Sequence, residues 1–80
     1  MRIDKFLKVS RIIKRRTVSN EACSLGKVKI NGRVAKPSTE VKAGDIIEIN
    51  FGSRSTKIEV ISVAENASKA EAAQMVRIIE

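Results

Sequence analysis

The sequence predicts an α+β domain in which two short N-terminal helices precede a small, mostly antiparallel sheet, with a short C-terminal helix. Apolar residues recur at helical spacing up to Gly26, and after it they alternate with polar residues, as in a strand. An Asn-Gly pair at residues 31–32 separates two such alternating runs. The chain has 80 residues and is 42% hydrophobic, which fits one domain over residues 1–80 rather than a disordered basic tail.

The first helix is expected over about Arg2–Ile12. One side of this helix is apolar and carries Ile3, Phe6, Leu7 and Ile13. The opposite side is charged and carries Asp4, Lys8, Arg11 and Arg15. The segment is therefore expected to be amphipathic, with one face in the core and one basic face.

The second helix follows a charged connection, Lys14–Arg16, and is expected to run from Thr17 to Leu25. Thr17 is a favourable N-cap residue. The apolar residues recur at positions i, i+4 and i+7, namely Val18, Ala22 and Leu25. Gly26 occupies the position at which a left-handed residue often ends a helix.

The sheet is expected to begin directly after this glycine. Lys27–Ile30 and Arg33–Ala35 flank the Asn31-Gly32 pair, which is typical of a β-hairpin. Two further strands are expected over Asp45–Phe51 and Lys57–Val63, with a turn at residues 52–54.

The C-terminal part contains one more helix signal. Ser68 and Glu71 have the spacing of a capping box, so a short helix is expected to follow Ser68 and to end near Met75. Val76–Ile79 then forms a last strand that closes the sheet.

Positive charge is concentrated in the first half of the chain. Residues 1–36 contain eleven Lys or Arg and only two acids, Asp4 and Glu21, for a net charge of +9. Residues 37–80 contain five bases and seven acids, for a net charge of −2. Such a one-sided positive field indicates a polyanionic partner. Because Phe6 and Phe51 are the only aromatic residues, contacts with phosphates are favoured over base stacking.

The bases around the two helices are expected to form the phosphate-binding surface. Arg15 and Arg16 offer planar guanidinium groups, and the start of the second helix adds backbone N–H groups near the Thr17 hydroxyl. The other residues expected on this surface are Lys5, Lys8, Arg11, Lys14, Lys27, Asn31 and Arg33. The alternative is that these side chains only keep an exposed face of the protein in contact with water and bind no ligand. That alternative is weakest for the run from Arg11 to Arg16, where four bases repel one another without a nearby acid.

Two polar residues and the cysteine have simpler interpretations. Asp4 either stabilises the dipole of the first helix or orients one of the arginines. Asn20 is expected to be an exposed polar residue. Cys23 is expected to be a small packed side chain.

Composition argues against an enzyme. The chain has no His and one Cys, so it lacks the usual zinc ligands and the commonest general base. It also has no glycine-rich phosphate loop, and no cofactor is expected. No signal peptide and no membrane span are expected, so the expected location is the cytoplasm. A DNA-binding regulator remains an alternative, but its usual helix-turn-helix needs a longer recognition helix than the two turns available before Gly26.

The order of motifs resembles the RNA-binding domain named after ribosomal protein S4, which carries an alpha-L motif. The resemblance rests on Arg2–Leu7, then Lys14–Thr17, then Leu25–Gly32. Ile3 and Ile30 are conservative departures from Leu and Val in the family pattern. The resemblance implies the alpha-L fold, and it adds Arg2 and Asp4 to the expected RNA surface beside Arg16.

The opening seventeen residues are most similar to short, stand-alone members of this family that act in ribosome-associated quality control. This resemblance implies binding to large-subunit rRNA and P-site tRNA on obstructed large subunits, in support of alanine tailing of stalled chains. It also implies the alanine-tailing factor RqcH as a candidate partner. Apart from the resemblance, a monomer without a cofactor is expected. The alternatives within the family are a ribosome assembly factor and a heat-shock factor that rescues tRNA.

Overall fold

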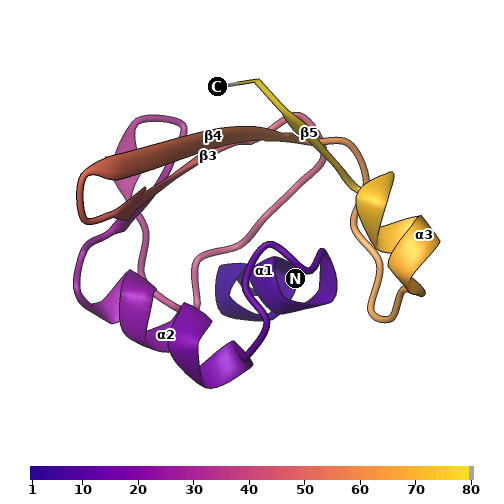
Figure 1. The fold of residues 1–80 in the computed structure, drawn as a ribbon, viewed down its shortest axis with the longest axis horizontal. Coiled ribbons are helices and arrows are strands. Elements are labelled where there is room, and N and C mark those ends of the chain that lie inside the picture. The colour runs from indigo at the N-terminus through magenta and orange to yellow at the C-terminus, as the bar shows by residue number, and fades with distance from the viewer. Residues whose placement is uncertain (80) are drawn as a thin grey trace.

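The computed structural model describes residues 1–79 as three short helices and five strands (Figure 1). The helices are α1 (Ile3–Val9), α2 (Arg16–Ser24) and α3 (Lys69–Ala73). The strands are β1 (Val28–Ile30), β2 (Arg33–Val34), β3 (Ile46–Phe51), β4 (Arg54–Val60) and β5 (Val76–Ile78). The predicted α+β class and the order of its elements are confirmed. Glu80, the last residue of the expected domain, lies outside the described residues.

The strands form one antiparallel sheet in the order β2-β1-β3-β4-β5. The longest pairing joins β3 and β4, in a register that places Ile47 opposite Ile58. A separate bridge joins Arg2 to Glu40, and the amide of Ile3 donates to the carbonyl of Thr39 at 2.8 Å. The N-terminus is therefore tied to the segment that leads into β3.

The three helices lie on one side of the sheet, with α1 between α2 and α3 (Figure 1). The core between the layers is aliphatic apart from Phe6, Cys23 and Met75. Its fully buried residues come from α1 and from the inner face of the sheet, namely Ile3, Phe6, Leu7, Val28, Ile47, Ile49 and Ile58. Burial of a side chain of this size stabilises the fold by about 1.5–3 kcal/mol, so this layer holds α1 in place.

The first helix is shorter than expected and ends at Val9 instead of Ile12. Arg11 has a φ of 63°, in the left-handed region, and its amide donates to the carbonyl of Lys8 at 3.0 Å. This turn returns the chain so that Ile13, whose amide donates to the Leu7 carbonyl at 3.0 Å, is buried from outside the helix. Ile13 therefore lies in the core, as its apolar character predicted. It reaches the core through a turn after the helix and not through a further helical turn.

The start of α2 also differs from the expectation. Arg15, not Thr17, is the N-cap residue, and no side chain caps this end. Thr17 instead lies in the first turn. The buried face of α2 consists of Ser19, Ala22 and Cys23, whereas Val18 and Leu25 are 44% and 61% exposed. The expected apolar line through Val18 and Leu25 is thus wrong, because α1 packs against an adjacent stripe of smaller side chains.

The predicted local signals at Gly26 and Asn31 are confirmed. Gly26 has a φ of 74°, and the amides of Gly26 and Lys27 donate to the carbonyls of Cys23 and Ala22, both at 3.0 Å. This pair of bonds is a Schellman motif, which ends the helix. Asn31 and Gly32 have φ of 50° and 83°, as a type I′ hairpin requires, and Ile30 pairs with Arg33.

Later boundaries shift by a few residues. The strand β4 begins at Arg54 rather than Lys57, because Phe51 pairs with Arg54 across a two-residue turn. It ends at Val60 rather than Val63, since the amides of residues 61 and 62 donate instead to the Met75 carbonyl. The capping box at Ser68 is confirmed, but α3 ends at Ala73. No helix within residues 1–79 is long and apolar enough to cross a membrane.

Candidate nucleic-acid interface

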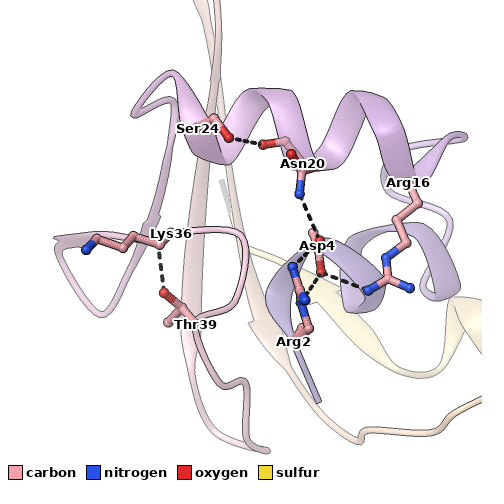
Figure 2. A network of polar contacts seen from close by, with 7 residues as sticks. All are labelled: Arg2, Asp4, Arg16, Asn20, Ser24, Lys36 and Thr39. Atoms are coloured by element: carbon pink, nitrogen blue, oxygen red, sulfur yellow. Dashed lines mark hydrogen bonds and ion pairs between the residues drawn. The ribbon is translucent and has the colours of Figure 1, made fainter.

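A buried carboxylate organises the polar contacts between α1 and α2. Asp4 is only 2% exposed, and its two oxygens accept hydrogen bonds from three side chains (Figure 2). Arg2 donates from Nε to Oδ1 at 3.2 Å and from Nη2 to Oδ2 at 3.1 Å. Arg16 donates from Nη2 to Oδ1 at 3.4 Å, and Asn20 donates from Nδ2 to Oδ2 at 3.2 Å. One carboxylate therefore joins the start of α1 to the first two turns of α2.

The network keeps Asp4 ionised. Burial by itself raises the pKa of a carboxyl group, but here the hydrogen bond from Asn20 and the charges of Arg16 and Arg2 outweigh burial and hold the Asp4 pKa below its ordinary value. A buried carboxylate without such partners would be costly. Of the two interpretations drawn from the sequence, orientation of arginines is the one that these contacts fit.

The two arginines remain half open to solvent while Asp4 holds them. The side chain of Arg2 is 51% exposed and that of Arg16 is 47% exposed. Together with Asp4, Thr17 and Asn20 they line a shallow hollow of about 420 Å³. We call this hollow the arginine cradle. Each guanidinium has five N–H donors, so both retain donors that can reach an anion in the cradle.

Backbone contacts fix the position of Arg2. Its bridge to Glu40 is flanked by a bond from the amide of Asp4 to the carbonyl of Pro37 at 3.3 Å. The turn that carries this carbonyl is closed by the Thr39 hydroxyl, which accepts from the amide of Lys36 at 2.9 Å (Figure 2). The backbone of Arg2, the N-cap residue of α1, is thus held in place, and its guanidinium is held by Asp4. The side chain therefore loses little further freedom when it binds a ligand.

Other predicted residues lie around a second hollow of about 550 Å³, on the other flank of α1. Lys8, Arg11 and Lys14 line it from α1 and the following turn. Asn66 lines it from the segment that leads into α3, and Lys69 lines it from the first position of α3. We call it the lysine groove. Lys5 lines neither hollow, and its Nζ forms an ion pair with Glu65.

The hairpin residues are separate from both hollows. Asn31 uses its side chain internally: Nδ2 donates to Oδ1 of Asp45 at 3.0 Å, and Oδ1 accepts from the amide of Ile46 at 2.9 Å. Arg33 lies beside it in a hollow that also contains Glu40 and Asp45. Lys27 lines yet another depression, with Leu25 and Phe51. The predicted residues therefore divide into groups instead of forming one continuous cluster.

Three polar residues at these hollows were not expected there, namely Asn20, Asn66 and Lys69. Asn20 has no local sequence signal, since its partner Asp4 is sixteen residues earlier. Within residues 1–79, no group of three or more His, Cys, Asp or Glu side chains could hold a metal ion. Cys23 is buried as expected, and burial followed by the charge of Asp4 raises the pKa of its thiol to about 11.

A comparison with models of protein families shows to which family this chain belongs. The model of the S4 domain matches residues 1–47, the part that contains the whole Asp4 network. The chain belongs to the S4 domain family. The resemblance seen in the motifs is thereby confirmed, and the 66–69 segment of the lysine groove lies beyond the matched residues.

Known relatives match this chain almost end to end. The chain is 48% identical over 79 residues to a protein of Streptococcus pneumoniae named RQC P-site tRNA stabilizing factor, covering 99% of this chain and 90% of that protein. It is 48% identical over 80 residues to a protein of the same name from Listeria monocytogenes, covering 100% and 87%. The trimeric structure of Vibrio cholerae heat shock protein 15 superposes with a TM-score of 0.89 at 31% identity, covering 99% of this chain and 81% of that one.

Proposed function

We propose that this S4 domain is an RNA-binding, ribosome-associated factor without catalytic activity. The observation that carries the proposal is the arginine cradle, in which a buried carboxylate holds two half-exposed guanidinium groups beside one another. Guanidinium groups bind phosphate oxygens through paired N–H donors. Because both arginines are already oriented, phosphate binding costs less side-chain entropy than it would for mobile lysines.

The partner we propose is structured RNA on the large ribosomal subunit, namely rRNA together with the P-site tRNA. The names of the relatives from Streptococcus pneumoniae and Listeria monocytogenes support the tRNA part of this proposal. The scarcity of aromatic side chains supports recognition through phosphates and helical shape, since Phe6 is buried and only Phe51 is exposed. On obstructed subunits, a bound factor would hold the tRNA during alanine tailing by the partner factor RqcH.

The proposed mechanism is positional. The Asp4 carboxylate orients Arg2 and Arg16, these two arginines grip phosphates, and the exposed Arg15 adds long-range attraction. Stabilisation of tRNA then follows from contacts to two RNA surfaces by one rigid domain, with no bond made or broken. Such a role would place the protein in the cytoplasm, as a monomer on its subunit.

A heat-shock factor that rescues tRNA is the second candidate, and the likeness to the Vibrio cholerae heat shock protein 15 favours it. The two candidates differ in what binding does to the tRNA. A stabilising factor slows the release of P-site tRNA from the large subunit, whereas a rescue factor moves the tRNA or frees it.

The experiment is a release assay on purified large subunits that carry a labelled P-site tRNA. We expect the protein to sediment with these subunits and to slow tRNA release. Small subunits and duplex DNA serve as controls for general attraction to polyanions, because a basic chain binds any of them weakly at low salt. Faster release would favour the rescue candidate, a preference for duplex DNA would favour a DNA-binding regulator, and no sedimentation with any subunit would refute the proposal.

A further inference from the structure

The lysine groove is a second concentration of positive charge, distinct from the arginine cradle. It has four bases around one hollow of about 550 Å³: Lys8, Arg11, Lys14 and Lys69. No acidic side chain of the described residues lines it. None of these four side chains forms a hydrogen bond or an ion pair within residues 1–79.

Long-range contacts build this groove. Lys8 is on α1, while Lys69 is the first residue of α3, sixty-one positions later. The Lys5–Glu65 ion pair joins α1 to the segment that carries Asn66. The capping box of Ser68 and Glu71 then fixes the backbone beside Lys69, with bonds of 2.9 and 3.2 Å. The fourth base is therefore brought to the other three by the fold and held there.

Charge around the groove is unbalanced. Like charges gathered around one hollow repel each other, and here no acid of the described part of the chain relieves them. The two acids nearest to Lys69 in sequence have other partners, because Glu71 accepts from the amide of Ser68 and Glu65 pairs with Lys5. A bound polyanion offsets this repulsion and releases its own counterions in doing so.

We infer that the lysine groove binds the phosphate backbone of a second RNA segment, while the arginine cradle binds the first. The helix α1 lies between α2 and α3 (Figure 1). The cradle is lined by residues of α2 as well as α1, and the groove by Lys69 of α3 as well as Lys8 of α1. The helix α1 thus forms a ridge between two anion-binding surfaces. This inference rests on the proposed function, and it extends the RNA surface beyond residues 1–47 into the 66–69 segment. Asn66 supplies an amide that can donate to a phosphate oxygen or a ribose hydroxyl.

The test compares three double variants with the wild type, in binding to large subunits that carry P-site tRNA over a series of salt concentrations. Lys8→Ala/Lys69→Ala removes two bases from the groove, and Arg2→Ala/Arg16→Ala removes the cradle. Lys42→Ala/Arg54→Ala is the matched control, because it removes the same charge from exposed side chains outside both hollows. Thermal melting of each variant confirms that it is folded.

We expect the groove variant to lower the slope of log affinity against log salt by about 1.4 to 1.8, which corresponds to two lost phosphate contacts. The control should change it much less. A groove variant that behaves like the control overturns the inference, even if the cradle variant loses affinity as the proposed function requires. A wild type that fails to bind subunits overturns both.

A second measurement identifies what occupies the groove. A photo-crosslinking residue at position 69 should react with RNA in the bound complex, as should one at position 17, which also lines the cradle. A crosslink from position 69 to a protein, or none at all while position 17 reacts with RNA, contradicts an RNA-binding groove.

Discussion

Asn20 on α2 donates a hydrogen bond of 3.2 Å from its Nδ2 to Oδ2 of Asp4 on α1, sixteen residues earlier in the chain. The other two partners of Asp4, Arg2 and Arg16, are charged, and their side chains are half exposed. The same bond sets the position of α2 relative to α1, because it joins the two helices through a buried carboxylate. Stability and ligand binding are thus linked at one residue.

Replacement of Asp4 should affect both properties. Asp4→Ala removes the acceptor of all three donors, and we expect the free energy of unfolding to fall by about 1–3 kcal/mol, as for other lost buried hydrogen-bond partners. The exposure of Arg2 and Arg16 keeps this figure from being larger. RNA affinity should fall as well, although the variant gains positive charge. Urea denaturation measures the change in stability, and RNA titration measures the change in affinity. Glu21→Ala, on the exposed face of α2, is the control. An Asp4→Ala variant that binds RNA more tightly than the wild type would show that charge matters more than orientation.

The pH dependence of stability should carry the signature of Asp4. Its pKa is lowered in the folded state, so the unfolded chain takes up the proton first as pH falls. The stabilisation is therefore complete above the ordinary aspartate value of about 3.9 and is lost as pH falls below it. Denaturation between about pH 2 and 6 should show this loss in the wild type and less of it in Asp4→Asn. Equal pH profiles for the two proteins would contradict the assignment.

The thiol of Cys23 should be nearly inert at neutral pH. Burial, with the charge of Asp4, raises its pKa to about 11, and the thiolate is the reactive form. We expect modification by a thiol reagent at pH 7.5 to be slow in the folded protein and to become fast in denaturant. Fast modification of the native protein would mean that α2 opens readily from the core.

The capping box at Ser68 should stabilise α3 and the wall of the lysine groove. Ser68→Ala removes the acceptor of the Glu71 amide, which costs about 0.5–2 kcal/mol at an N-cap. We expect faster hydrogen exchange in residues 71–75 and little change in α1. Ser62→Ala, at an exposed position before α3, is the control. Unchanged exchange in α3 would indicate that packing of Met75, not the cap, holds this helix.

Sequence signals predicted the elements whose determinants are local. The Asn31-Gly32 turn, the Gly26 helix end and the Ser68–Glu71 box each depend on a few neighbouring residues, and all three are present. The predicted boundaries were wrong where packing of distant residues determines the structure. The end of α1 depends on the turn at Arg11 that returns Ile13 to the core, and no pattern within α1 contains that information.

The same limit applies to the site. Charge and family resemblance indicated Arg2, Asp4 and Arg16, which the structure brings together. They could not indicate Asn20 or Lys69, because each reaches its hollow through contacts far away in sequence. Nor could they reveal that the side chain of Asn31 forms hydrogen bonds with Asp45 and Ile46 within the fold.

The central claim is that oriented arginines, rather than charge alone, give this domain its affinity for RNA. The most direct measurement compares Arg2→Lys/Arg16→Lys with the wild type in binding to large subunits that carry P-site tRNA. The lysine variant has the same charge, but it lacks the paired donors and the orientation by Asp4. We predict a clear loss of affinity at each salt concentration, with a smaller change in the salt dependence. Wild-type affinity in this variant would contradict the account.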